Sequence, residues 1–170
     1  MTKDQKTVAA GAASGIAAMI LSLWLFYTIL PDPASPAMVG ERLGYAARWI
    51  AFAALPLFAM LGAVGNARFL SEAIDPTVGK ESASMTIDGR VADNTLQQFV
   101  LFAAGALSLA AATAGHEVKI VGAAAITFFI MRIAFWIGYR IKPVYRAFGF
   151  SSTAYMNLGL LLGAMWLSLS

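Results

Sequence analysis

Five stretches of the sequence are long and apolar enough to cross a lipid bilayer as helices, and this constrains the fold more than any other feature. They cover Val8–Leu30, Ala47–Ala67, Val91–Ala114, Ile120–Tyr139 and Phe150–Leu167. Only 12% of the 170 residues are charged, about half the fraction found in a typical soluble domain. No stretch alternates polar and apolar residues as the strands of a membrane barrel do. The sequence therefore predicts an all-α integral membrane protein.

The connections between the stretches carry unequal numbers of Lys and Arg, and this bias predicts the orientation. With five spans, one side of the membrane holds Lys3, Lys6, Arg68, Lys80, Arg90, Arg140, Lys142 and Arg146, and the other holds Arg42, Arg48 and Lys119. The first side should be cytoplasmic. The N-terminus is then cytoplasmic and the C-terminus lies on the opposite side; in a bacterium the membrane would be the cell inner membrane.

The first stretch has an alternative interpretation as a signal peptide. Lys3 and Lys6 precede it, and Ser35-Pro-Ala37 resembles a cleavage site. Its apolar run is longer than that of a typical signal peptide, so a retained helix is favoured. Cleavage would leave the other four stretches in the same orientation.

Several function classes are disfavoured by composition. The chain has no cysteine and a single histidine, His116, which argues against thiolate or histidine metal sites and against Ser-His-Asp catalysis. The net charge is only +3, and the cations are spread over the connections, so nucleic acid binding has little support. If the protein is an enzyme, its reactive group should arrive with a substrate.

Polar side chains within the third and fourth stretches are the candidate site. Arg90, Asn94 and Gln97 are spaced i, i+4 and i+7, so they share one face of a helix at its polar end. Arg132, Phe135 and Tyr139 repeat that spacing on the next helix, and Arg146 follows near the start of the fifth, where the helix dipole favours an anion. These groups should converge at one membrane depth and attract a ligand that carries carboxylates or a thiolate.

Structural roles are the alternative for several of these residues. For Asn94 and Gln97 the spacing favours ligand binding and hydrogen bonding between helices equally, and Asp93 is a candidate partner for the buried Arg132. Arg140 and Lys142 are better interpreted as cations that flank a helix and extend their charged groups to the membrane surface. Two G-x-x-x-G patterns, Gly11–Gly15 and Gly159–Gly163, allow close packing of helices.

Two motifs resemble those of a known family. The segment Arg90-Val-Ala-Asp-Asn94-Thr-Leu-Gln97 resembles the R-x-x-x-N-x-x-E signature of the MAPEG family, the membrane-associated proteins in eicosanoid and glutathione metabolism. Arg132-Ile-Ala-Phe135-Trp-Ile-Gly138-Tyr139, with Arg146 seven residues later, is similar to the family's second motif, and Arg68 resembles the arginine that ends its first helix. The resemblance covers Ala47 to Leu167, as in a bacterial-type member with an extra N-terminal helix.

The resemblance implies a four-helix transmembrane bundle over residues 47–170, preceded by the extra helix and connection of residues 1–46. It also implies a homotrimer that binds glutathione between adjacent subunits on the cytoplasmic side, without a metal. The implied glutathione-binding residues are Arg68, Arg90, Asn94, Gln97, Arg132 and Tyr139. Arg146 would be the catalytic residue that stabilises the glutathione thiolate.

The implied activity is that of a glutathione transferase or peroxidase acting on lipophilic electrophiles or lipid hydroperoxides. The alternative is a non-catalytic structural or lipid-binding adaptor of the same fold. Two departures bear on this choice: Gln97 stands where the family usually has glutamate, and Phe135 stands where members often have tyrosine. The first removes an acceptor charge that could pair with the amino group of the substrate or with a neighbouring arginine, and the second removes a hydroxyl group. Both departures weaken the case for tight glutathione binding.

Overall fold

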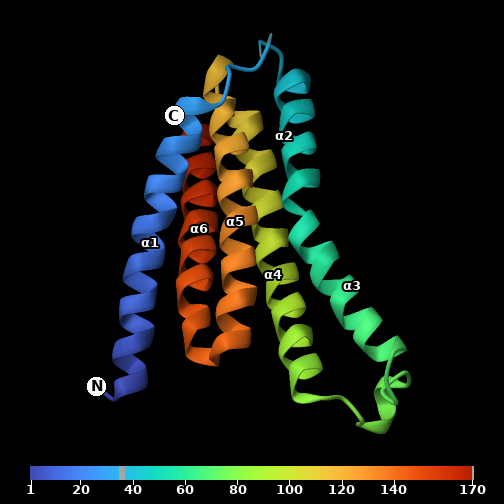
Figure 1. Cartoon of the computed structure of the whole chain (residues 1–170). Helices are drawn as coiled ribbons and strands as arrows, with labels where there is room; N and C mark the ends of the chain where they lie inside the picture. The colour runs from blue at the N-terminus through green and yellow to red at the C-terminus, as the bar shows by residue number, and fades with distance from the viewer. Residues whose placement is uncertain (35–36, 170) are drawn as a thin grey trace.

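The computed structural model describes residues 1–34 and 37–169, and every regular element in those ranges is helical. The long helices are α1 (Lys3–Ile29), α2 (Val39–Ala53), α3 (Leu55–Phe69), α4 (Ala83–Ala112), α5 (Lys119–Ile141) and α6 (Ala147–Leu169). Three short 3-10 turns, η1 (Pro76–Val78), η2 (Gly115–Val118) and η3 (Pro143–Arg146), lie between them. The predicted all-α fold is confirmed (Figure 1). Ser35 and Pro36 of the possible cleavage site lie outside the described residues.

Four segments of the described chain are long and apolar enough to cross a membrane: Lys3–Ile29, Val39–Phe69, Ala83–Ala112 and Gly115–Ile141. The last helix, α6, has 23 residues but is not among the four, and it carries Ser151, Ser152, Thr153 and Asn157 on its buried face. It runs beside α5 along most of that helix (Figure 1). The fifth span thus remains a prediction, supported by this place in the bundle.

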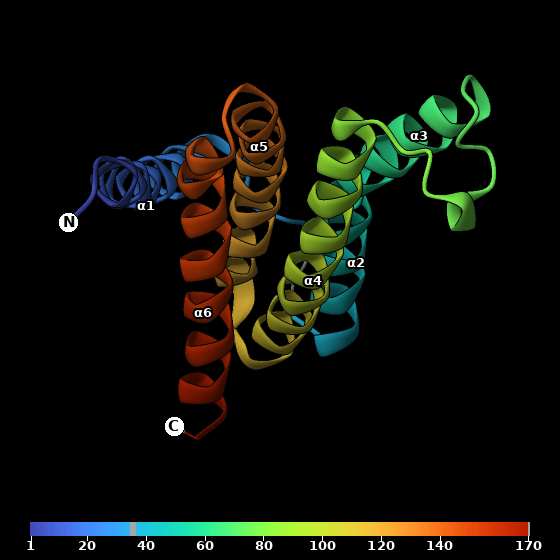
Figure 2. The ribbon, with the colours of Figure 1, turned by 90° about the horizontal axis from the view of Figure 1, so that it is seen from below.

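The predicted starts of the second and third helices were wrong, and α1 begins at Lys3 rather than Val8. The second stretch begins at Val39 rather than Ala47, and it divides into α2 and α3 just before Pro56, because proline removes a backbone N–H and clashes with the preceding turn. Figure 2 shows α3 leaving the direction of α2. The third stretch begins at Ala83 rather than Val91, where the Ser82 hydroxyl accepts a hydrogen bond from the N–H of Met85 at 3.2 Å. Arg90 is therefore well inside α4 and does not open it.

The core lies where α4, α5 and α6 meet, with α1 on one flank and α2 on the other (Figure 2). Phe102 and Phe128 are fully buried there, and their ring centroids are 4.8 Å apart. The N-terminus, the connection 70–82 and the turn η3 lie at one end of the molecule, and the C-terminus lies at the other (Figure 1). This alternation agrees with the order of loops assumed in the charge argument.

The first G-x-x-x-G pattern packs α1 directly onto α6. A Cβ added at Gly15 would collide with the carbonyl group of Phe148, and the Ser152 hydroxyl donates a hydrogen bond to the Gly15 carbonyl at 2.8 Å. The second pattern has no such contact among the described residues: Gly159 has nothing within 4 Å. The extra N-terminal helix is thus an integrally packed part of the structure.

Candidate functional site

A cavity of about 360 Å³ opens where α4, α5 and the start of α6 meet. Its lining residues are Arg90, Asn94, Phe135, Tyr139, Arg146 and Phe150. Two guanidinium groups, an amide and a phenol therefore face two aromatic rings, and no acid is among the lining residues. The volume lies within the usual range of small-molecule pockets. The arrangement suits an anionic ligand with an apolar portion.

Arg146 is held against Tyr139 by the tight turn between α5 and α6. Its Nη1 donates a hydrogen bond to the Tyr139 hydroxyl oxygen at 3.1 Å, and its guanidinium carbon lies 5.2 Å from the ring centroid. The turn needs glycine at two places. A Cβ at Gly138 would lie 2.9 Å from the carbonyl oxygen of Tyr145, and one at Gly149 would collide with the α5 backbone at Met131.

Arg132 lies behind the cavity and is completely buried. Its Nε and Nη2 donate to the Thr95 hydroxyl oxygen at 3.1 and 2.6 Å, and Nη1 donates to that of Thr153 at 3.3 Å. Nη2 also donates to Oδ1 of Asn94 at 3.1 Å, so it orients the amide that lines the cavity. Its guanidinium carbon sits 3.9 Å from the ring centroid of Phe135. Arg132 thus supports the site from behind.

No carboxylate forms an ion pair with Arg132 within the described residues. Asp93 is exposed on α4 and is not a partner, so the predicted pairing of Asp93 with Arg132 was wrong. Hydroxyl and amide oxygens take the place of an acid. Asn94 therefore serves both of the roles that the sequence left open, as a contact between helices and as a lining residue.

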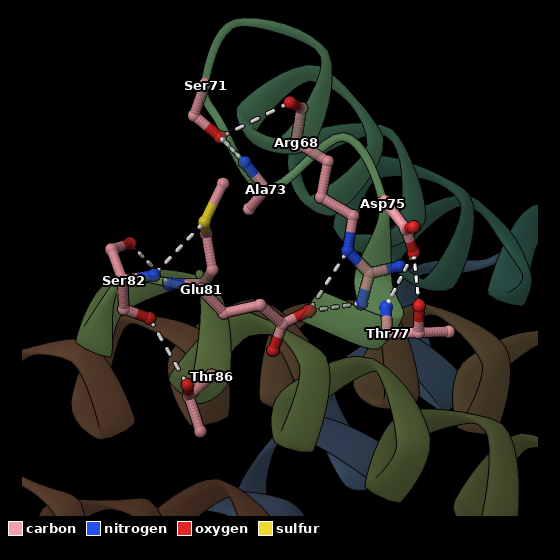
Figure 3. Close-up of polar contacts among 9 residues, drawn as sticks. Arg68, Ser71, Ala73, Asp75, Thr77, Glu81, Ser82 and Thr86 are labelled. Carbon is pink, nitrogen blue, oxygen red and sulfur yellow. Dashed lines mark hydrogen bonds and ion pairs between the residues drawn. The ribbon is translucent and has the colours of Figure 1, made fainter. Parts of the chain in front are cut away.

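Arg68 and Gln97 do not reach the cavity of their own chain. Arg68, at the end of α3, donates from Nε to Oε1 of Glu81 at 3.1 Å and closes the connection 70–82, as Figure 3 shows. The same connection is ordered by Asp75, whose carboxylate accepts from the N–H of Thr77 at 2.8 Å. Gln97 is exposed on α4. Four of the predicted site residues thus come together, Arg132 lies behind them, and these two point elsewhere.

Asp88 is a buried charge that the sequence prediction missed. It accepts hydrogen bonds at 2.8 Å from Nε1 of Trp136 and from Nε of Arg140, and it forms an ion pair with Arg140. Arg140 is therefore more than a flanking cation. Because the predicted helix began at Val91, Asp88 was placed in a loop; a helix start at the Ser82 cap would have put it on the face that meets α5.

Arg42 was also misplaced, because residues 31–46 were expected to be a loop. It lies in the first turns of α2 and is buried. Its Nε donates to the carbonyl oxygen of Ala110 at 3.1 Å, and Nη2 donates to that of Ala111 at 3.4 Å. A cation at the end of α4 satisfies carbonyl groups that lack partners within the helix and complements its dipole.

Comparison with known proteins adds an independent finding. A sequence model of the MAPEG family matches residues 46–166, which is most of the chain and includes every residue that lines the cavity. Searches of curated proteins and of solved structures returned no match. The match begins within α2 and leaves α1 outside it. On the extent of this match, together with its helical membrane architecture, the chain belongs to the MAPEG family.

Proposed function

We propose that this protein binds glutathione in the cavity on α4, α5 and α6 and uses it as a transferase or peroxidase for lipophilic substrates. The observation that carries the proposal is the set of cationic and neutral polar groups around one cavity without an acid: Arg90, Asn94, Tyr139 and Arg146. Glutathione carries two carboxylates and one thiol. Guanidinium groups bind carboxylates through paired, charge-assisted hydrogen bonds.

In this proposal the thiol of glutathione lies beside Arg146. A free thiol has a pKa of about 8.5, and the thiolate is the nucleophile. Lowering that pKa by ~2 units requires about 3 kcal/mol of preferential stabilisation of the thiolate. Arg146 directly precedes the N-terminus of α6, so a guanidinium charge and the helix dipole would act on the same atom. Tyr139 orients Arg146 through its hydroxyl oxygen.

The chemistry follows from the thiolate. With an electrophile, the sulfur would form a bond to the electron-poor carbon, and a leaving group or an electron pair moves away from that carbon. With a hydroperoxide, the sulfur would attack the outer oxygen, and the O–O bond breaks to give an alcohol and a glutathione sulfenic acid. A second glutathione then yields the disulfide and water. Phe150, beside Arg146 in the lining, would contact the apolar substrate or product near the reacting sulfur.

A homotrimer is part of the proposal, because two predicted ligands point away from the cavity of their own chain. Gln97 is exposed on α4, and Arg68 lies at the end of α3 with a partly exposed side chain. Both would be available to a ligand held by an adjacent subunit. When a ligand carboxylate binds, the Arg68 guanidinium would either donate to it in place of Glu81 or donate to both carboxylates.

A non-catalytic lipid-binding protein is the second candidate function. It is favoured by Gln97 and Phe135, which supply an amide and an apolar ring where the family's glutamate and tyrosine would supply a charge and a hydroxyl. In that case Arg90 and Arg146, the two arginines that line the cavity, would bind the headgroup of an anionic lipid. The protein would then copurify with lipid and show no glutathione-dependent turnover.

The two functions are separated by the ultraviolet absorbance of the thiolate, measured while detergent-purified protein is titrated with glutathione at neutral pH. A saturable thiolate signal is expected in the natural protein. It should fall to the few per cent expected of free glutathione in Arg146→Ala. Lys142→Ala is the matched control, because Lys142 lies in the same turn region and, within the described residues, its side chain bonds only to the exposed Asp4, at 3.3 Å. Equal signals in Arg146→Ala and the natural protein would refute the role of Arg146.

A further inference from the structure

A second cavity, of about 280 Å³, lies on the other side of Arg146 from the glutathione site proposed above. Its lining residues are Val8, Val144, Arg146, Ala147, Phe150 and Ser151. Arg146 and Phe150 also line the first cavity, so these two side chains separate the two spaces. We call this second cavity the side chamber. Any molecule in it would meet the same guanidinium group that the thiolate is proposed to meet.

The outer wall of the side chamber belongs to α1, through Val8. The position of that wall is set one turn further along, where Gly11 and Gly15 bring the α1 backbone onto the start of α6. A Cβ at Gly11 would lie 3.4 Å from Cβ of Ala147, and Gly15 is in direct backbone contact with Phe148. Because Val8 and Gly11 are three residues apart, they share a helix face, and Val8 falls over the turn that carries Arg146.

The residues that line the side chamber indicate which kind of ligand would bind there. Arg146 is its one charged lining residue, and apart from Ser151 the others are apolar. An unbranched hydrocarbon chain with a polar oxygen-containing end group fits this pattern, with the chain against Val8, Val144 and Ala147. Its end group would lie at Arg146. A second peptide segment does not fit, because its backbone would bring polar groups that these apolar walls cannot satisfy.

We propose that the side chamber is the binding site for the lipophilic second substrate, and that α1 gives this chain a wall for it. The helix lies outside the segment 46–166 that the family model matches, so this site is a property of the chain's additional helix. The inference rests on the proposed function. It places the acyl chain in the side chamber and the glutathione in the first cavity, with Arg146 between them.

The test is photolabelling of the full chain in phosphatidylcholine nanodiscs with a palmitic acid analogue that carries a diazirine and an alkyne. Labelled positions are mapped by mass spectrometry. We expect saturable labelling of α1 near Val8 and of residues 144–151. Val8→Trp should fill the side chamber and lower that labelling at least five-fold. Ile20→Trp is the matched control, since Ile20 is an exposed position on the same helix and lies outside the lining.

Each outcome bears on the chamber separately from the glutathione site, because labelling uses no glutathione. Labelling of Val8→Trp equal to that of the natural protein, or labelling of 144–151 that rises without saturation, would overturn the proposal. Saturable labelling lost only in Val8→Trp supports an acyl-chain site in the side chamber. If the thiolate titration fails, that site still stands, and its role as the second-substrate site falls together with the proposed function. Val8→Trp should also keep the thiolate signal; its loss there would show that the two cavities are not separate sites.

Discussion

Thr95→Val tests whether hydroxyl groups are what makes the buried Arg132 tolerable. The Thr95 hydroxyl oxygen accepts two hydrogen bonds from the guanidinium, at 3.1 and 2.6 Å, and the residue is itself fully buried. Valine has nearly the same shape, so the substitution removes the acceptor and leaves the packing almost unchanged. Among the described residues, the guanidinium would then keep only Asn94 and the more distant Thr153 as acceptors.

The expected loss of unfolding free energy in Thr95→Val follows from two typical hydrogen-bond energies. A hydrogen bond to a charged group contributes about 1.5–3 kcal/mol in proteins, whereas neutral side-chain hydrogen bonds between membrane helices average about 0.6 kcal/mol. Two bonds to a guanidinium that has no exposed surface should therefore contribute about 2–3 kcal/mol together. The measurement is the free energy of unfolding in mixed micelles of sodium dodecyl sulphate, followed by circular dichroism.

Thr153→Val is the matched control on the opposite helix. Thr153 is equally buried, but it accepts a single bond from Arg132, at 3.3 Å, so its loss should cost about 1 kcal/mol or less. The reasoning is refuted if Thr95→Val costs no more than Thr153→Val. It is also refuted if Thr95→Val is neutral, because the buried guanidinium would then be satisfied by some other group.

Two further predictions concern acids at the two ends of the molecule. Asp88→Asn should lower the unfolding free energy by about 1–2 kcal/mol, since the ion pair with the half-exposed Arg140 is lost and an amide oxygen remains as an acceptor. Asp93→Asn, an exposed acid on the same helix, should change it by less than about 0.5 kcal/mol, and equal effects would contradict the assignment. Asp32 accepts a hydrogen bond from Lys119 at 2.6 Å, and this contact lowers the pKa of Asp32 below its ordinary value. A carboxyl whose folded pKa is lowered stabilises the protein above its unfolded pKa of about 4 and loses that contribution as the pH falls. The midpoint of thermal unfolding should thus drop less steeply below pH ~4 in Asp32→Asn than in the natural chain, and parallel curves would show that the pair contributes nothing.

Much of the site could be predicted because spacing within a helix determines which side chains share a face. Arg90 with Asn94, and Phe135 with Tyr139, needed only the period of the helix to be placed together, and they line one cavity. The turn to Arg146 was also predictable, since Pro143 follows the end of α5 and Arg146 comes just before the next apolar stretch. Helix starts were less predictable: the apolar pattern begins at Val91, whereas the cap that starts the helix is Ser82.

The sequence by itself determined that the chain is helical and suited to a membrane, because apolar length and the lack of charge leave the backbone few other ways to satisfy its polar groups. It also determined which side chains share each helix face. Only the tertiary structure decided which charges meet: Arg132 with hydroxyl groups instead of Asp93, Arg140 with Asp88, and Arg42 with the end of α4. These pairings depend on the rotation and depth at which helices pack. Close backbone contacts set that rotation and depth, as at Gly15 and Gly149, and hydropathy along one helix does not encode the neighbour it will meet.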